Sequence, residues 1–373
     1  MNSVVPLMLL LANGLPSPAT LPATTTAPAM AAAMVTRHAD DTQPHVIVSS
    51  LIVRAKRFTR YNPPGAKEPV YGTWSWVPDF EFYMRGPLEG GSQITVNFQK
   101  PNGAPWLSVP VETPEINAGD SQKITCPDFD EHQAIVPVGL VPFQIILKNS
   151  LTGAKKVLFS GKADVRKFKY KYDKAPGAFE FYVDQDWMLP MGFLAVNTEL
   201  SSEAPMLEAR IWVKNINERD NTVAVYVLYN GQPIASSKHM NDAMTPDQIN
   251  VSDDRTISTA GMTNGDPEWR RLLILMTKIR VNGSTNAVYP THYLDKNPGV
   301  YEIRVMKSGQ PVCSAKFTVG ADGKIVDDGR GKALGTIWTF LPVHHVKDGL
   351  PASPTSYKTG AFYGNPLPGF VAP

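Results

Sequence analysis

The sequence predicts an all-β protein: two tandem β-sandwich domains followed by an extended C-terminal arm. First, between Val46 and Val326 apolar and polar residues alternate in short runs, which is typical of half-buried strands. Second, 33 prolines and 28 glycines in 373 residues favour short strands and frequent turns over long helices. Third, the same order of strand-like segments occurs twice, which indicates two copies of one domain.

Residues 1–45 are expected to form a signal-like apolar segment and a Pro/Ala/Thr-rich leader. The run "MNSVVPLMLLLANGL" is too short to span a bilayer as a helix, but it fits the apolar region of a secretory signal. Small residues from Ala29 to Ala33 offer a cleavage site, so we expect export to the periplasm, cell envelope or extracellular space. However, no Lys or Arg precedes Arg37 and Pro6 interrupts the run, which leaves a disordered leader on a retained protein as the alternative.

The first predicted domain covers residues 46–165. Its strand-like segments include "HVIVSSLIVRAKRF", "DFEFYMRG" and "SQITVNFQKPNGAPWLSV", the last with a turn at Asn102-Gly103. "FQIILKNSLTGAKKVLFSGKADV" follows as a hairpin around Thr152-Gly153. Asn-Gly between alternating apolar residues is a strong hairpin signal, so these segments predict consecutive antiparallel strands.

The second predicted domain covers residues 166–326 and repeats this order. Asn230-Gly231 again joins two strand-like runs, and "NPGVYEIRVMKSGQPVCSAKFTV" again forms the closing hairpin. Tyr301 takes the place that Phe143 has in the first copy. An insertion of about Lys238 to Trp269 enlarges the second copy.

The phrase "NPGVYEIRV" resembles the penultimate strand of immunoglobulin-like and fibronectin-like domains, where a Gly turn precedes Tyr and alternating apolar residues. The resemblance covers this phrase and implies immunoglobulin-like sandwiches. It is a resemblance of fold, and a fold of this kind does not assign a function.

The segment "GDPEWRRLLILMTKIRV" is ambiguous between helix and strand. Asp266 can cap a helix and Pro267 suits its first position. The following residues Trp269, Leu272, Leu273, Met276 and Ile279 share one helical face. The tail "TKIRV" is rich in strand formers, so the sequence leaves the boundary between helix and strand open.

The stretch "VRKFKYKYDKAPGAFEFYVDQD" predicts one hairpin with a charged face and an aromatic face. The charged face would pair lysines with acids: Lys167, Lys169 and Lys171 with Glu180, Asp184 and Asp186. The opposite, aromatic face would hold Phe168, Tyr170, Tyr172, Phe179, Phe181 and Val183. The alternative is a surface for an anionic partner. A net charge of +2 on the whole chain disfavours nucleic acid as that partner.

The C-terminal arm, residues 327–373, is rich in Pro, Gly and aromatic residues and lacks alternation. Its large apolar side chains would be costly to leave in water, so the arm is expected either to wrap its own domains or to dock on a partner. The candidate partner-binding residues are Trp338, Phe340, Leu341, Phe362, Tyr363 and Phe370.

No catalytic motif is found, and we expect neither cofactor nor metal. The chain contains no Gly-rich phosphate loop, nucleophile elbow or zinc-protease helix motif. Asp128, Asp130 and His132 would share a face if extended, but these letters also describe an ordinary polar loop. Cys126 and Cys313 are expected to be two buried thiols, since two cysteines are too few for a disulfide framework.

The function expected from the sequence is therefore non-catalytic. We expect an exported accessory or scaffold subunit of an envelope or membrane-associated assembly that binds a protein partner and has no membrane span. The alternative is a carbohydrate-binding module, because Trp74 and Trp76 share one face of a strand and could stack on a sugar. A hydrolase with a site made of scattered residues is a third possibility.

Overall fold

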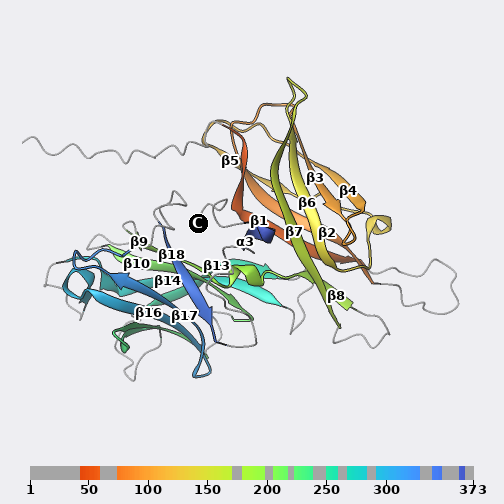
Figure 1. The fold of residues 1–373 in the computed structure, drawn as a ribbon. Helices are drawn as coiled ribbons and strands as arrows, with labels where there is room; N and C mark the ends of the chain where they lie inside the picture. Colours follow the sequence, from red (N-terminus) through yellow and green to blue (C-terminus); the bar gives the residue numbers. More distant parts are fainter. Residues whose placement is uncertain are drawn as a thin grey trace, which may run out of the picture. The chain divides into compact units, whose positions relative to one another are not determined.

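The computed structural model describes residues 43–58, 74–169, 179–197, 205–216, 222–237, 249–258, 267–283, 291–327, 338–346 and 361–365. Strands are the dominant regular structure of these residues (Figure 1), which confirms the all-β prediction. Within these ranges the only α-helix is α3, Ala361–Gly364. The predicted signal-like segment up to residue 42 lies outside them.

The first half of the described chain forms two sheets with the orders β1-β2-β5 and β4-β3-β6-β7-β8 (Figure 1). The inner faces of both sheets contribute to one cluster that includes Phe80, Phe82, Phe98 and Phe143. The strands are β1 His45–Phe58, β2 Ser75–Arg85, β3 Gln93–Gln99, β4 Pro105–Val111, β5 Ser121–Thr125, β6 Gly139–Lys148, β7 Lys155–Lys169 and β8 Phe179–Val183, with the short 3-10 helix η2 Glu131–Gln133.

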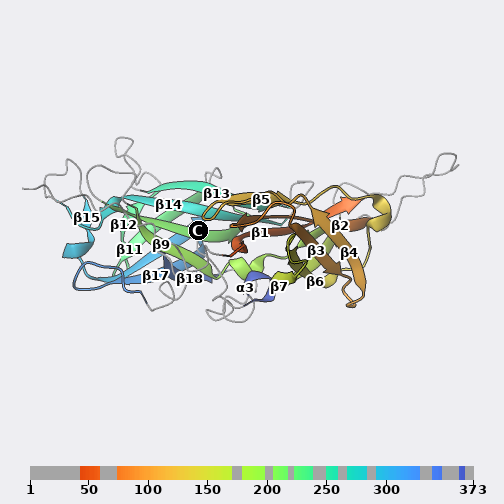
Figure 2. The ribbon, with the colours of Figure 1, turned by 90° about the horizontal axis from the view of Figure 1, so that it is seen from above.

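The second half forms one sheet with the order β12-β11-β16-β17-β18-β9-β10-β14-β13, and β15 pairs with β14 (Figure 2). The strands are β9 Met191–Asn197, β10 Met206–Lys214, β11 Val223–Tyr229, β12 Gln232–Ser236, β13 Asn250–Ser258, β14 Glu268–Arg280, β15 His292–Tyr293, β16 Gly299–Lys307, β17 Gln310–Val319 and β18 Thr339–His345, with the 3-10 helices η3 Asp186–Met188 and η4 Leu294–Lys296.

The two halves share a strand order. β4-β3-β6-β7 corresponds to β12-β11-β16-β17, and β1-β2-β5 corresponds to β9-β10-β14. The two Asn-Gly turns join equivalent hairpins, with positive φ at Gly103 and Gly231, so both predicted hairpins are confirmed. In the equivalent strand pairs, Phe143 lies opposite Phe98 and Tyr301 lies opposite Tyr229. β13, from the predicted insertion, adds a strand at the sheet edge.

The predicted boundary between the domains, after Val165, falls inside β7. β7 continues to Lys169 and pairs with β8, so the first half extends to Val183. The strand does not stop at Val165 because the alternating run after it offers no turn residue.

The β7–β8 pair confirms the predicted hairpin, but the predicted faces are wrong. Lys167 lies opposite Phe181 and Lys169 lies opposite Phe179, so the lysines share a face with phenylalanines rather than with acids. The Lys167 ammonium lies 4.6 Å from the Phe179 ring centroid. Glu180 lies on the opposite face of the hairpin, where it is buried and pairs with Arg57. This ion pair with a residue distant in sequence explains why Glu180 does not share a face with the lysines.

β14 resolves the helix–strand ambiguity in favour of a strand throughout. It pairs with β10 on one side and β13 on the other. Leu272, Ile274 and Met276 are fully buried in alternation, which is the period of a strand. The helical alternative is therefore overturned, because long-range pairing on both edges outweighs the local capping signal at Pro267.

Part of the predicted arm is a strand of the second sheet. β18 pairs with β17 through residues Val343 to His345 and with β9 through Thr339 to Pro342. Gly192 in β9 makes this approach possible, since a Cβ there would lie 2.8 Å from the Leu341 carbonyl oxygen. The arm therefore joins two groups of strands into one continuous sheet.

The described residues form three apolar clusters. One lies in each half, and the third connects Ile52 of β1 with Phe193, Trp269, Trp338 and Phe340 of the second half. In the described ranges, helices of a length and apolarity suited to crossing a membrane are absent.

Candidate functional site

The C-terminal residues predicted to bind a partner are buried where the structure describes them. Trp338, Phe340, Leu341 and Tyr363 have exposed fractions of 8%, 2%, 1% and 3%. The side chain of Phe362 and the whole of Phe370 lie outside the described residues. The described side chains therefore cover the chain's own core, the first of the two roles expected for the arm, and partner binding by the arm stays a prediction.

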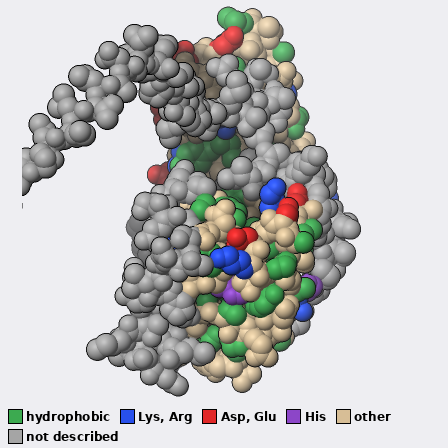
Figure 3. Space-filling view, turned by 90° about the vertical axis from the view of Figure 1, so that its left-hand side faces the viewer, with side chains coloured by type: hydrophobic (Ala, Val, Ile, Leu, Met, Phe, Trp, Pro, Cys, Tyr) green, Lys and Arg blue, Asp and Glu red, His purple; other side chains and the backbone are tan. Residues whose placement is uncertain are grey.

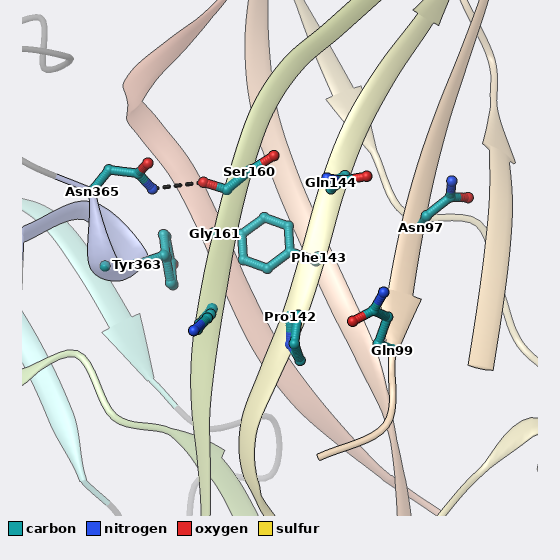
Figure 4. Close-up of a pocket in the computed structure, with 11 residues that line it drawn as sticks. Asn97, Gln99, Pro142, Phe143, Gln144, Ser160, Gly161, Tyr363 and Asn365 are labelled. Carbon is teal, nitrogen blue, oxygen red and sulfur yellow. Dashed lines mark hydrogen bonds between the residues drawn. The ribbon is translucent and has the colours of Figure 1, made fainter. Parts of the chain in front are cut away.

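Tyr363 fixes α3 against the first half. Its ring packs edge-on against Phe143 and Trp187, with centroid distances of 5.6 and 5.1 Å. Gly161 in β7 leaves room for it, because a Cβ at that position would lie 3.0 Å from the Tyr363 Cβ and 2.8 Å from the Phe159 ring. Asn365 then donates a hydrogen bond of 2.7 Å to the Ser160 carbonyl oxygen at the edge of β7 (Figure 4).

A groove of about 400 Å³ lies between this terminal segment and the outer side of the first half. Figure 4 shows its residues on β3, β6, β7 and α3. The lining residues are Asn97, Gln99, Pro142, Phe143, Gln144, Ser160, Gly161, Lys162, Tyr363, Gly364 and Asn365. We call this the amide groove, after its four side-chain amides.

The amide groove can donate and accept hydrogen bonds along its length. Gln99 and Gln144 are exposed, and Asn97 and Asn365 are half-buried. Each amide side chain offers an acceptor oxygen and two N–H donors, which matches the groups of a peptide backbone. Lys162 adds an exposed positive charge. The rings of Phe143 and Tyr363 are buried, so they offer no stacking platform for a sugar.

The two tryptophans of the carbohydrate alternative do not form a stacking surface. Trp76 is 1% exposed, and its indole N–H donates to the Pro137 carbonyl oxygen at 2.9 Å. Trp74 is 9% exposed, with the Arg57 guanidinium carbon 4.3 Å from its ring centroid. The carbohydrate alternative therefore loses both rings on which it was based, because core packing and a cation already occupy their faces.

Both thiols and two of the histidines, His292 and His345, are partly or fully desolvated. Burial raises the pKa of Cys126 and of Cys313 to about 12, so neither is an activated nucleophile. Burial lowers the pKa of His292 and of His345. Both cysteines are free thiols; Cys313 is buried, as expected from the sequence, whereas Cys126 is only half-buried.

The acidic cluster before β6 does not converge on an ion. Asp128 has an almost fully exposed side chain and pairs with Lys56 at 3.1 Å. Asp130 and His132 are exposed as well. Within the described ranges no group of three or more His, Cys, Asp or Glu side chains is placed to hold a metal ion.

A second cavity, of about 350 Å³, is lined by Ser49, Ser50, Glu81, Phe82, Tyr83, Lys123, Arg255 and Arg271. We call it the arginine cavity. Its lining side chains include three cations and one carboxylate. Elsewhere the charges are mixed: on the described surface visible in Figure 3, acidic and basic side chains lie among polar and apolar ones.

Sequence reasoning missed both cavities. The alternation "ITVNFQ" does indicate that Asn97 and Gln99 point away from the core, and this is the one signal the groove offers. Arg255 and Arg271 are distant in sequence, and only strand pairing brings them together.

Neither protein-family models nor curated proteins give a relative from which a function could be transferred. No protein-family model matches the chain. The search of curated proteins finds no significant match either. The function must therefore be argued from the cavities and their chemistry.

Proposed function

We propose that the protein is a non-catalytic interaction protein that binds a protein partner through the amide groove. In this proposal the partner presents an extended segment, and Asn97, Gln99 and Gln144 bond to its main chain while Lys162 meets an acidic side chain. The observation that carries the proposal is the groove itself, in which four amides and a cation lie between the sheet and the terminal segment. Such a lining suits a peptide, which offers alternating N–H and C=O groups.

The scaffold in this proposal is a pair of immunoglobulin-like sandwiches. The shared strand order of the two halves supports it, with a three-stranded and a four-stranded set in each. The apolar cluster between Ile52 and Trp269 supports a rigid connection. A rigid scaffold with a fixed groove lowers the entropy cost of binding.

The cellular role we propose is that of an exported accessory or scaffold subunit of an envelope or membrane-associated assembly. The signal-like segment of residues 1–45 supports export. The raised thiol pKa values argue against a cysteine nucleophile, since cysteine catalysis needs a thiolate.

The test is affinity isolation of the intact chain from its native cells, followed by mass spectrometry. The groove variant carries Gln99→Ala and Gln144→Ala, both exposed positions whose loss leaves the core unchanged. The matched control carries Gln232→Ala and Gln310→Ala, two exposed strand glutamines of the second half. Truncation before β18 is unsuitable, because it would remove Phe340 and Leu341 from the core.

The proposal predicts one stoichiometric partner that the wild type and the control retain and the groove variant loses. Equal recovery with both variants, or a wild type that is isolated alone, would contradict it. A glycan array with the same intact chain separates the alternative, since glycan binding without a protein partner would favour the carbohydrate module.

A further inference from the structure

The arginine cavity contains a pair of like charges that face each other. Arg255 in β13 and Arg271 in β14 are direct cross-strand partners. Like charges in this relationship destabilise a sheet unless something compensates them. Lys123 from β5 lines the same cavity and adds a third cation.

Most charges around the cavity have a partner of opposite sign. Arg271 donates from Nε to Asp254 at 2.6 Å. Lys123 pairs with Glu81 at 2.8 Å, and Glu81 also accepts from Arg54. Among the described lining residues Glu81 is the one carboxylate, and Lys123 and Arg54 already share it.

Arg255 differs from these cations because it contacts only neutral acceptors. Its guanidinium donates to the carbonyl oxygens of Ser49 and Ser50, the latter at 2.7 Å. Among the described residues that line the cavity, it is the one cation without a carboxylate contact. Burial first, and then the charge of Arg271, lower the pKa of Arg255 to about 10. Among the described residues, no carboxylate therefore contacts the Arg255 guanidinium; Glu81 and Asp254 act on its charge from beyond ion-pair distance and raise its pKa in part.

Hydrogen-bond donors in the cavity are also in excess. The terminal nitrogens of Arg271 and the hydroxyls of Ser49 and Tyr83 donate to no described acceptor. Unused donors beside a guanidinium that no described carboxylate contacts suit a ligand with a negative charge and several acceptor oxygens. A cavity of about 350 Å³ has the volume for a small molecule or a single functional group.

We propose that the arginine cavity binds a small oxyanion, a carboxylate or phosphate group seated between Arg255 and Arg271 and within reach of Lys123. A purely structural role for Arg255 explains fewer of these observations than an oxyanion site does. It explains the bonds to Ser49 and Ser50, which lie in the irregular stretch of β1. A structural role for Arg255 does not explain why Arg271 lies opposite it in the neighbouring strand, nor why the terminal nitrogens of Arg271 donate to no described acceptor. This site is distinct from the amide groove and does not depend on the proposed function.

The test is calorimetric titration of the intact chain with sodium phosphate, sodium sulfate and sodium acetate at low ionic strength. We expect saturable binding of at least one of them, with one site per chain. Phosphate or sulfate binding identifies a tetrahedral group, and acetate binding identifies a carboxylate. Arg271→Gln and Lys123→Gln should each weaken binding about tenfold or more, the effect of losing a charge-assisted hydrogen bond.

The matched control is Arg270→Gln. Arg270 neighbours Arg271 in β14, but it pairs with Glu268 and Asp253 and does not line the cavity. Arg255 itself is left unchanged, because its substitution would strip two carbonyl groups of their donor. At a given concentration the bound oxyanion should also raise the melting temperature of the wild type and the control by more than that of Arg271→Gln. Absence of saturable binding for all three anions, or equal affinity in Arg271→Gln and Arg270→Gln, would overturn the proposal.

Discussion

Val53 donates its backbone N–H to the hydroxyl oxygen of Tyr363 at 2.8 Å, across 310 positions of the chain. Gln185 completes the contact, with its side-chain amide donating to the Val53 carbonyl oxygen at 3.1 Å and to the same hydroxyl at 3.2 Å. β1 near the start of the described chain, Gln185 just before η3 and Tyr363 in α3 therefore meet at one buried point. The C-terminal segment thus takes part in holding the fold together.

Tyr363→Phe should destabilise the protein. The change keeps the ring in place but removes the acceptor for the Val53 N–H, and a buried unsatisfied donor costs about 1–3 kcal/mol. The measurement is the free energy of unfolding from a urea titration. The matched control is Tyr83→Phe, an exposed tyrosine whose loss should stay within about 0.5 kcal/mol. Equal stability of the two variants would mean that the Tyr363 contact contributes nothing.

Gly161→Val should displace the terminal segment. The added side chain would meet the Phe159 ring and Tyr363, and overpacking of this kind costs about 1–3 kcal/mol. Urea titration gives the stability, and limited proteolysis reports whether the segment around Tyr363 becomes cleavable. Ser160→Val is the control, because it places the same side chain on the neighbouring exposed position. A Gly161→Val protein as stable and as resistant as the control would contradict the packing described above.

Stability should fall as the solution is made mildly acidic. Burial lowers the pKa of His292 and of His345, so the folded state favours their neutral forms. The unfolded chain binds more protons just below its ordinary histidine pKa of about 6.5, so the free energy of unfolding decreases as pH falls below that value. Above it the two histidines contribute no pH dependence.

The measurement is the urea midpoint between about pH 8 and about pH 5, for the wild type and for the double variant His292→Gln/His345→Gln. The variant should show a flatter profile below about pH 6.5. Asp184, whose pKa burial raises, is present in both proteins and cancels in the comparison. Identical slopes in this window would contradict the assignment.

Neither cysteine should react with a thiol reagent in the folded protein near neutral pH. The pKa of each is raised to about 12 by burial, which leaves almost no thiolate. Both should react promptly after unfolding. Single variants Cys126→Ser and Cys313→Ser assign any signal, and fast labelling of either thiol in native buffer would disprove its desolvated position.

The local pattern of the sequence was sufficient for the all-β class and for several hairpins. Asn102-Gly103 and Asn230-Gly231 predict their turns because the positive φ found at Gly103, Asn230 and Gly231 is adopted cheaply by Gly and Asn. The matching places of Phe143 and Tyr301 could be read from alternation alone. These features depend on neighbours in the chain, so their signals are local.

The local sequence pattern could not predict which residues lie opposite one another in paired strands. The lysines of β7 face Phe179 and Phe181 because the pairing register differs by one residue from the one that charge pairing favours, and burial of Glu180 against Arg57 fits that register. β14 is a strand because β10 and β13 pair with both of its edges. In each case a partner far away in sequence outweighed the local preference.

The sequence by itself determined the strand-forming segments, their turns and the apolar character of the C-terminal arm, because these follow from side-chain alternation and backbone preference. Only the tertiary structure decided where that arm lies and which polar residues meet. β18 enters the second sheet, Tyr363 reaches Val53, and Arg255 stands opposite Arg271. Burial and strand pairing are long-range effects, so both cavities exist only once the chain has folded.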